Sequence, residues 1–523
     1  MRHRPTTPHS GDAGGDHGGS PPEVSRATSG SASVAARVSR NAAILIAGHA
    51  LSYAMRIVYI GVLARYAGPD GVGRISTATS LVAILVLLVT FGLDTLIVRD
   101  VAAHPERTGD VASQATVLRL GLTIVYCAVL LGVTLFSAYP HETRVIIGIY
   151  GLAYILDNLY GVARSVFHAH QQMVYGAAIE VGRDLINVAA SLVAIHLGWS
   201  LPAIVAISAV ASLAKLLAGW AVLRLRFARF TLRIRRRDAI AMLQRAMPFA
   251  AVLALGVLYA QMNTVMLSWW KPEEAVGLFS AAVMPVGILL IVPSMFMESI
   301  FPAFSAYADA GSPGLVRAYR ASFRALLLIG LAMGAGTMVV AGPVIGIIYG
   351  PDFAGAAPVL RVLAIQLLSM VGYVNGALLQ ATGRQIAFAR VRAGLTALNA
   401  VLCLLLIRPL GYMGAALAAV IPGAIDMFLY TAWCHRSLGL GFPWRLIGRA
   451  ACCATAMALA TFLGLRVGVP LVVVVLLVAP TVYGVALVAL RVLDREEYQY
   501  LSRVLQYARW RKRLLPHSEA KGG

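Results

Sequence analysis

The sequence predicts an all-α, polytopic membrane protein with about 14 transmembrane helices. They form two parallel-repeat six-helix bundles around a central cavity, plus two C-terminal helices. Three observations support this prediction. Of the 523 residues, 59% are hydrophobic and only 13% are charged, against about 25% charged residues in a soluble domain. Apolar stretches of membrane-spanning length recur along the chain, and basic residues gather in every second connection between them.

The predicted transmembrane helices follow from length and apolar character. A helix needs about 20 mainly apolar residues to cross a hydrocarbon layer ~30 Å thick. The stretches that meet this requirement are residues 41–63, 74–96, 115–137, 144–166, 174–197, 201–223, 248–270, 276–301, 321–348, 356–381, 386–407, 411–434, 446–466 and 470–490.

The distribution of Lys and Arg orients these helices. With the N-terminus in the cytoplasm, 34 of the 44 Lys and Arg residues fall in cytoplasmic segments and six in external connections. The positive-inside rule therefore predicts that both termini are cytoplasmic. The net charge of +21 is then explained largely by topology, so no nucleic-acid partner is expected.

Composition divides the chain into six segments. The first is rich in Gly, Ser and Pro and is predicted to be disordered, while the last combines a basic face with an apolar face and is predicted to lie on the membrane surface. The segments are a disordered cytoplasmic tail (1–40), an N-terminal six-helix bundle (41–223), a basic cytoplasmic linker (224–247), a second six-helix bundle (248–434), two additional transmembrane helices (435–490) and a basic tail with an interfacial helix (491–523).

A weak internal repeat relates the two bundles. The turn "GPDGVGRISTA" (68–78) is similar to "KPEEAVGLFSAA" (271–282), and "LGWS" (197–200) is similar to "LGYM" (410–413). Six helices are an even number, so both halves enter the membrane with the same orientation. Parallel repeats of this kind enclose a central cavity between the halves.

The first predicted helix has one polar face. His49, Ser52, Tyr53, Arg56 and Tyr59 follow a helical spacing that puts them on the same side. An arginine near the membrane centre costs roughly 2.5–3.5 kcal/mol, so this face should line a water-filled cavity. The alternatives are that Arg56 pairs with a carboxylate for assembly or that its side chain reaches the external surface.

Charged residues also occur in the fifth and sixth predicted helices. Glu180, Arg183 and Asp184 lie within one helical turn, a spacing that permits local ion pairs. Lys215 has no acidic residue within a turn, and Asp157 in the fourth helix is its candidate partner. The three carboxylates are candidates for coupling to protons or sodium, or are simply ion-paired with their neighbours.

The second half carries fewer charges. Arg361, Gln366 and Tyr373 fall on roughly one stripe of the tenth predicted helix, and Asn263 makes the seventh polar. Cations together with hydroxyl and amide groups suit a lipid that carries phosphate and sugar. The predicted sugar-binding or cavity-lining residues are His49, Ser52, Tyr53, Tyr59, Asn263, Gln366 and Tyr373.

Motifs for catalysis are missing from the sequence. There is no G-x-x-x-x-G-K-[ST] stretch, so ATP hydrolysis is not expected. HExxH and GxSxG are also absent, and the external connections are too short for the catalytic loop of a membrane-embedded polysaccharide polymerase or ligase. We expect no enzymatic activity, catalytic residue, cofactor or metal.

The ordered motifs resemble those of a known family. Residues 62–102 are similar to the opening hairpin of the polysaccharide flippases in the MOP (multidrug/oligosaccharidyl-lipid/polysaccharide) exporter superfamily. Residues 247–283, 299–306, 349–364 and 411–421 resemble later segments of that family. One departure is "MNT" at 262–264, where relatives often have an Arg-x-Asp-like pair.

The resemblance implies a function and partners. It implies a flippase that carries undecaprenyl-pyrophosphate-linked oligosaccharide across the bacterial cytoplasmic (inner) membrane by alternating access. The product would serve cell-surface polysaccharide, lipopolysaccharide or exopolysaccharide, with a polymerase and export machinery as further partners. Lipid II and multidrug exporters of the same superfamily are the alternatives, and a membrane-embedded polymerase or ligase is the alternative from another class.

The resemblance also implies roles for residues. The pyrophosphate is expected at Arg56, assisted by Lys215, Arg361 and Arg183. The lipid tail would remain in the bilayer, along a groove by the thirteenth and fourteenth helices.

Overall fold

The computed structural model describes residues 24–227, 236–309 and 313–492, with side chains described from Met55 onward except at a few positions. The first helix, α1, begins at Val24. It therefore extends into the stretch 1–40 that was predicted to be disordered, while residues 1–23 lie outside the described part. The predicted interfacial helix of the C-terminal tail also lies outside it.

The first half of the chain forms six crossings. α1 (Val24–Leu85) contains two of them, because the chain reverses at Gly68 (φ 67°, ψ −179°), which precedes Pro69. The second crossing continues through α2 (Leu87–Thr90) and α3 (Leu93–Ala103), which are separated at Phe91 and Gly92, both at positive φ. The other four are α4 (Thr108–Phe136), α5 (His141–Ala169), α6 (Met173–His196) and α7 (Leu201–Arg226).

The second half repeats this order and adds two crossings. Its elements are α8 (Arg236–Trp270), α9 (Glu273–Leu289), α10 (Ile291–Asp309), α11 (Pro313–Ile348), α12 (Ala356–Leu363), α13 (Ile365–Leu368), α14 (Val371–Ala381), α15 (Gln385–Leu410) and α16 (Tyr412–Ser437). The additional crossings are α17 (Trp444–Arg466) and the run of α18 (Leu471–Val473), η3 (Val474–Val478) and α19 (Ala479–Ala489).

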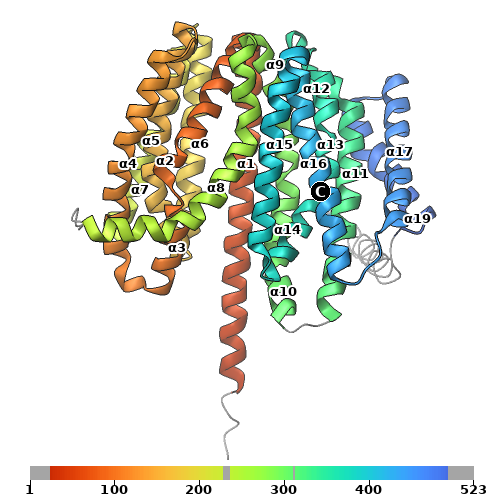
Figure 1. Cartoon of the computed structure of the whole chain (residues 1–523), viewed down its shortest axis with the longest axis horizontal. Coiled ribbons are helices and arrows are strands. Elements are labelled where there is room, and N and C mark those ends of the chain that lie inside the picture. The colour runs from red at the N-terminus through yellow and green to blue at the C-terminus, as the bar shows by residue number, and fades with distance from the viewer. Residues whose placement is uncertain (1–23, 228–235, 310–312, 493–523) are drawn as a thin grey trace, which may run out of the picture.

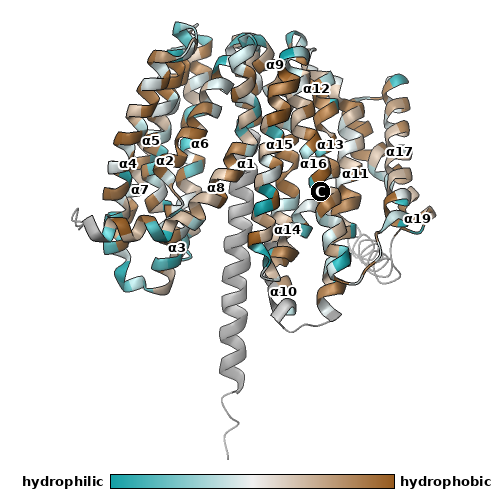
Figure 2. Cartoon of the chain, in the orientation of Figure 1, coloured by the Kyte–Doolittle hydropathy of each residue, from teal (hydrophilic) through white to brown (hydrophobic). Residues whose placement is uncertain are grey.

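The predicted all-α membrane fold is confirmed. Every regular element of the described residues is a helix, and twelve of them are long and apolar enough to cross a membrane. The prediction has 14 crossings. The stretch Met55–Thr90 is counted once among the twelve but contains two crossings, which are both arms of α1. The other crossing is α6, whose three charged residues lower its apolar character and keep it out of the twelve. Hydrophobic residues cover the helices along much of their length (Figure 2).

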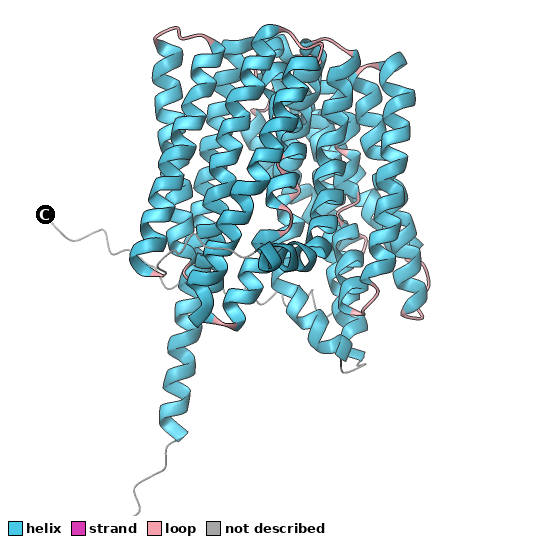
Figure 3. Cartoon of the chain, turned by 60° about the vertical axis from the view of Figure 1, so that its left-hand side comes forward, coloured by secondary structure: helices cyan, strands magenta, loops and turns pink. Residues whose placement is uncertain are grey.

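The two halves stand side by side with α1 and α9 between them (Figure 1). α17 and α19 lie at the outer edge of the second half, and the long helices stand upright with most loops at their two ends (Figure 3). We name these ends after the topology prediction. The external end holds the turn at Gly68, and the cytoplasmic end is the one beyond which α1 extends.

A reciprocal glycine contact joins the halves at the external end. A Cβ atom on Gly73 would collide with the backbone oxygen of Glu273, and one on Gly277 would collide with that of Pro69. These residues belong to the two turns identified as repeats in the sequence. The contact therefore relates the halves by an approximate two-fold axis, as expected for parallel repeats, and only glycine permits this approach.

Candidate functional site

A polar cavity of about 580 Å³ is lined mainly by the first half of the chain. Its walls come from both arms of α1 and from α5, α6 and α7, while the second half contributes only residues of α9 and Tyr349 at the external end of α11. All of its charged lining residues belong to the first half. They are Arg56, Asp157, Arg164, Glu180, Arg183, Asp184 and Lys215.

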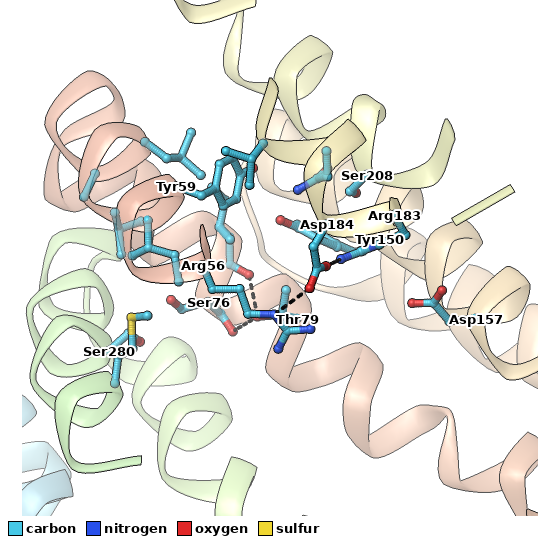
Figure 4. A pocket seen from close by; sticks show the side chains of 18 of the residues that line it. Arg56, Tyr59, Ser76, Thr79, Tyr150, Asp157, Arg183, Asp184, Ser208 and Ser280 are labelled. Atoms are coloured by element: carbon cyan, nitrogen blue, oxygen red, sulfur yellow. Dashed lines mark hydrogen bonds and ion pairs between the residues drawn. The ribbon is translucent and has the colours of Figure 1, made fainter. Parts of the chain in front are cut away.

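Arg56 extends from α1 into this cavity toward Asp184 on α6 (Figure 4). Its side chain is 56% exposed, and its Nε lies 3.7 Å from Oδ2 of Asp184, whose own side chain is only 6% exposed. Asp184 also accepts a hydrogen bond of 2.9 Å from Arg183. Because the buried carboxylate retains Arg183, Arg56 is held weakly and its guanidinium is accessible to a ligand.

The predicted partner of Lys215 is confirmed. Its Nζ lies 2.8 Å from Oδ1 of Asp157 and 4.8 Å from the ring centre of Tyr160, and the lysine side chain is 12% exposed. Removing Lys215 from this pair would leave the partly buried carboxylate of Asp157, which is 30% exposed, without its counter-charge. Lys215 is therefore less accessible to a ligand than Arg56.

Arg164, near the cytoplasmic end of the predicted helix 144–166, also lines the cavity, although it was not among the predicted site residues. It belongs to α5, its side chain is 45% exposed, and its nearest carboxylates are Asp94 at 3.8 Å and Glu180 at 3.9 Å. The missed signal was its spacing, because Arg164 follows Asp157 by two helical turns and shares its face.

Below the cavity, a buried ion pair fixes the cytoplasmic part of the first half. Arg119 of α4 is fully buried and donates hydrogen bonds to the carbonyl of Asn158 and, at 2.6 Å, to Asp94. Asp94 also accepts a bond of 3.0 Å from Ser165. Arg119, near the cytoplasmic end of the predicted helix 115–137, thus joins α3, α4 and α5.

The polar walls of the cavity include atoms without a partner. Arg183 Nε and Asn187 Oδ1 are buried and make no hydrogen bond in the described part of the chain. Tyr59, Ser76, Thr79 and Ser208 add hydroxyl groups to the lining. A cavity of this size with unsatisfied polar atoms holds water or a polar ligand.

Several predicted site residues of the second half do not line this cavity. Arg361 is exposed on α12, and Gln366 and Tyr373 lie on α13 and α14, separate segments of a broken helix. Asn263 is buried, where its Oδ1 accepts a bond of 3.1 Å from Cys403 and its amide lies 3.5 Å from the Ala415 carbonyl.

Three predicted residues lie where side chains are not described. These are His49, Ser52 and Tyr53, on the part of α1 that precedes Met55.

An apolar groove of about 540 Å³ adjoins the polar cavity. Met284 and Tyr349 line both. From there the groove passes Ile57, Ile288 and Met333 and continues along the thirteenth and fourteenth crossings, in the place predicted for a lipid tail. Its lining residues on those two crossings are Met457, Thr461, Val475, Ala479, Pro480 and Tyr483.

One ion pair and two hydrogen bonds join the two halves above the cavity. Arg74 lies 2.5 Å from Glu273 of α9 and also binds Glu142, while Thr143 donates a hydrogen bond to Glu273. Arg65 donates a bond of 2.5 Å to the carbonyl of Ile347. Together with the glycine contact, these interactions hold the external ends of the halves together.

Comparisons with known proteins agree with the resemblance seen in the sequence. A family model described as "Polysaccharide biosynthesis protein" matches residues 38–308. A curated relative, the "Probable low-salt glycan biosynthesis flippase Agl15" of Haloferax volcanii, is 24% identical over 205 residues. That alignment covers 39% of this chain and 43% of the relative, so the chain spans less than half of that relative's length.

Solved structures show the same fold. A lipid II flippase MurJ in an inward closed conformation matches with a TM-score of 0.71 and 12% identity, over 84% of this chain and 97% of that one. An inward-facing multidrug resistance MATE family transporter of the MOP superfamily matches with a TM-score of 0.60 and 15% identity, over 74% and 94%.

Proposed function

Because this chain belongs to the polysaccharide biosynthesis protein family, we propose that it flips a lipid-linked oligosaccharide across the bacterial cytoplasmic membrane, without ATP hydrolysis. The carrier is undecaprenyl pyrophosphate, and the product serves cell-surface or exopolysaccharide assembly. One observation carries the proposal. A charged cavity and a long apolar groove meet at Met284 and Tyr349, as a substrate with an anionic head and a hydrocarbon tail requires.

Arg56 is the proposed principal ligand of the pyrophosphate. Its side chain is half exposed, and among the described side chains its carboxylate contact is the 3.7 Å approach to Asp184, which keeps Arg183 as a partner when Arg56 leaves. A guanidinium matches the oxygens of a phosphate through paired, charge-assisted hydrogen bonds. Arg56 can therefore exchange the carboxylate for the ligand at little cost.

The sugars are proposed to contact the hydroxyl and amide groups that line the cavity beside Arg56. These are Tyr59, Ser76, Thr79, Asn187 and Ser208. The lipid tail would stay in the apolar groove, which connects the cavity to the surface beside α17 and α19. A multidrug exporter has no need for such a groove, whereas lipid II shares both requirements and must be separated by experiment.

Alternating access would require the external contacts to break. Arg74, Glu273 and the glycine contact join the halves above the cavity, so their separation would open it to the outside. Each carboxylate in the cavity lies beside a cation. We assign Asp157, Glu180 and Asp184 the role of neutralising those cations until the headgroup binds. Coupling of transport to protons or sodium is the alternative role of the same three residues.

Flipping in proteoliposomes tests the proposal. A short-chain pyrophosphate-linked oligosaccharide is placed in one leaflet, and its arrival in the other is followed for the wild type, Arg56→Gln and Arg361→Gln. Loss of the charge-assisted bonds should slow Arg56→Gln roughly tenfold or more, while Arg361, outside the cavity, is the matched control.

Two results would contradict the proposal. Transport of lipid II but not of the oligosaccharide lipid would show that lipid II is the substrate. Equal transport by wild type and Arg56→Gln would show that Arg56 does not bind the transported headgroup.

A further inference from the structure

We propose that Arg164 captures the anionic headgroup at the cytoplasmic mouth of the cavity before the headgroup reaches Arg56. This inference rests on the proposed function and on the predicted orientation. It assigns a separate step of ligand entry to a residue that the family resemblance did not indicate.

Arg164 and Arg56 lie at different depths in the cavity. At about 1.5 Å per residue, Arg164 lies about 35 Å along α5 from its external end at His141, whereas Arg56 lies about 18 Å along α1 from the turn at Gly68. Both distances are measured from the external end, where α5 begins and where the first arm of α1 ends. Arg164 therefore lies more than 10 Å closer to the cytoplasmic end than Arg56, yet both line one continuous cavity.

Arg164 can leave its two carboxylate partners to bind a ligand. Its carboxylate contacts are long, at 3.8 Å to Asp94 and 3.9 Å to Glu180. Asp94 retains its shorter bonds to Arg119 and Ser165 when Arg164 moves away. Glu180 loses its ion pair when a ligand takes the guanidinium, but its side chain is 31% exposed and water can solvate it. Release of Arg164 therefore avoids the main cost of disrupting a buried ion pair, which is an unpaired buried charge.

The four cations of the cavity differ in exposure and in how closely they are paired. Lys215 is 12% exposed and Arg183 is 18% exposed, and each has a carboxylate oxygen within 2.9 Å. Arg164 and Arg56 are 45% and 56% exposed. The cavity thus has two accessible cations at different depths and two committed ones between them. The carboxylate of Glu180, one turn from Arg183 and Asp184 on α6, separates the two accessible sites.

A capture residue and a deep ligand have different kinetic signatures. A charge at a rim changes mainly the association rate and its salt dependence, whereas loss of a buried charged contact changes mainly the dissociation rate. We therefore expect Arg164→Gln to slow association by about tenfold at low salt, with the difference shrinking as screening increases. Arg56→Gln should instead speed dissociation.

The test uses farnesyl pyrophosphate, which carries the diphosphate on a short prenyl chain, with the full chain in detergent. Association and dissociation are measured by stopped flow at several salt concentrations. Arg164→Lys keeps the charge and should retain most of the association rate. Arg224→Gln is the matched control, because Arg224 is exposed at the end of α7 and does not line the cavity.

Glu180→Gln supplies a test of opposite sign. It releases Arg164 and should speed association several-fold, and the gain should disappear in the double variant with Arg164→Gln. This variant keeps the inference testable if Arg164→Gln does not fold. An association rate unchanged in Arg164→Gln, or in Glu180→Gln, overturns the capture role. No binding and no flipping by the wild type would instead reject the proposed function itself.

Discussion

Neutralising Arg74 should shift the molecule toward a state that is open at the external end. In the structure, Arg74 lies 2.5 Å from Glu273 in the other half, with side chains 26% and 19% exposed. Its second partner, Glu142, belongs to its own half and is 40% exposed. Of the two ion pairs of Arg74, only the one with Glu273 therefore connects the halves, and Arg74→Gln removes the positive charge from it.

The size of the effect follows from that contact. A hydrogen bond to a charged group is worth about 1.5–3 kcal/mol when buried, and partial exposure reduces this to about 1.5 kcal/mol. Since about 1.4 kcal/mol corresponds to a factor of ten, the ratio of open to closed molecules should rise about tenfold. The remaining glycine contact and the Arg65 hydrogen bond would still favour closure.

Distances between spin labels measure this shift directly. Labels at His141 and Glu274, both exposed at the external end of opposite halves, are introduced after replacement of the five native cysteines. The wild type should give one short distance, and Arg74→Gln should add a longer one. Arg466→Gln, at the external end of α17, is the control.

A charge exchange sharpens the test. Arg74→Glu combined with Glu273→Arg should restore the short distance that either single variant loses, provided that Glu142→Gln is added, because Glu142 would otherwise repel the introduced carboxylate. An unchanged distance distribution in Arg74→Gln would refute the reasoning, because the ion pair would then contribute nothing to closure.

Three further predictions concern stability and the groove. Arg119→Gln should lower the free energy of unfolding by about 1.5–3 kcal/mol, because it removes the charge-assisted hydrogen bonds of a fully buried guanidinium to Asp94 and to the Asn158 carbonyl; thermal unfolding in detergent measures this, and an unchanged melting temperature would contradict it. Lys215→Met should reduce folded protein, and adding Asp157→Asn should recover it if the pair is coupled as the 2.8 Å contact indicates. Val475→Trp should fill the apolar groove and slow flipping of long-tailed lipids, while Leu476→Trp, at the next position and outside the groove, should not; equal rates would exclude the groove from the lipid path.

The crossings, the repeat and one ion pair between neighbouring helices were predictable from the sequence. Membrane-spanning length and the similarity of the two external turns anticipated the crossings and the repeat, and the glycine contact gives that similarity a physical basis. The polarity of the first helix correctly indicated that Arg56 faces a cavity. Opposite charges on neighbouring helices suggested the pair of Lys215 and Asp157.

Other features depended on geometry that a sequence pattern does not contain. Arg361, Gln366 and Tyr373 form a stripe only if their helix is continuous, but that crossing is divided into α12, α13 and α14. The stripe therefore does not define one face. Arg164 was missed because a positive residue near a helix end satisfies the positive-inside rule whether it faces the cytoplasm or the cavity.

The glycine contact also bears on how the protein experiences the membrane voltage. The polar cavity extends from Arg164 up to Val72 and Ser76, and the halves meet at Gly73 and Gly277. About one helical turn, roughly 5 Å, thus separates the interior of the cavity from the outside. With an aqueous cavity below it, most of the transmembrane potential would fall across this thin seal, where each elementary charge is worth about 2.3 kcal/mol per 100 mV. Arg74 lies between Val72 and Ser76, at the level of the glycine contact and beside this seal, so the energised membrane would act on the contacts that keep the external end shut.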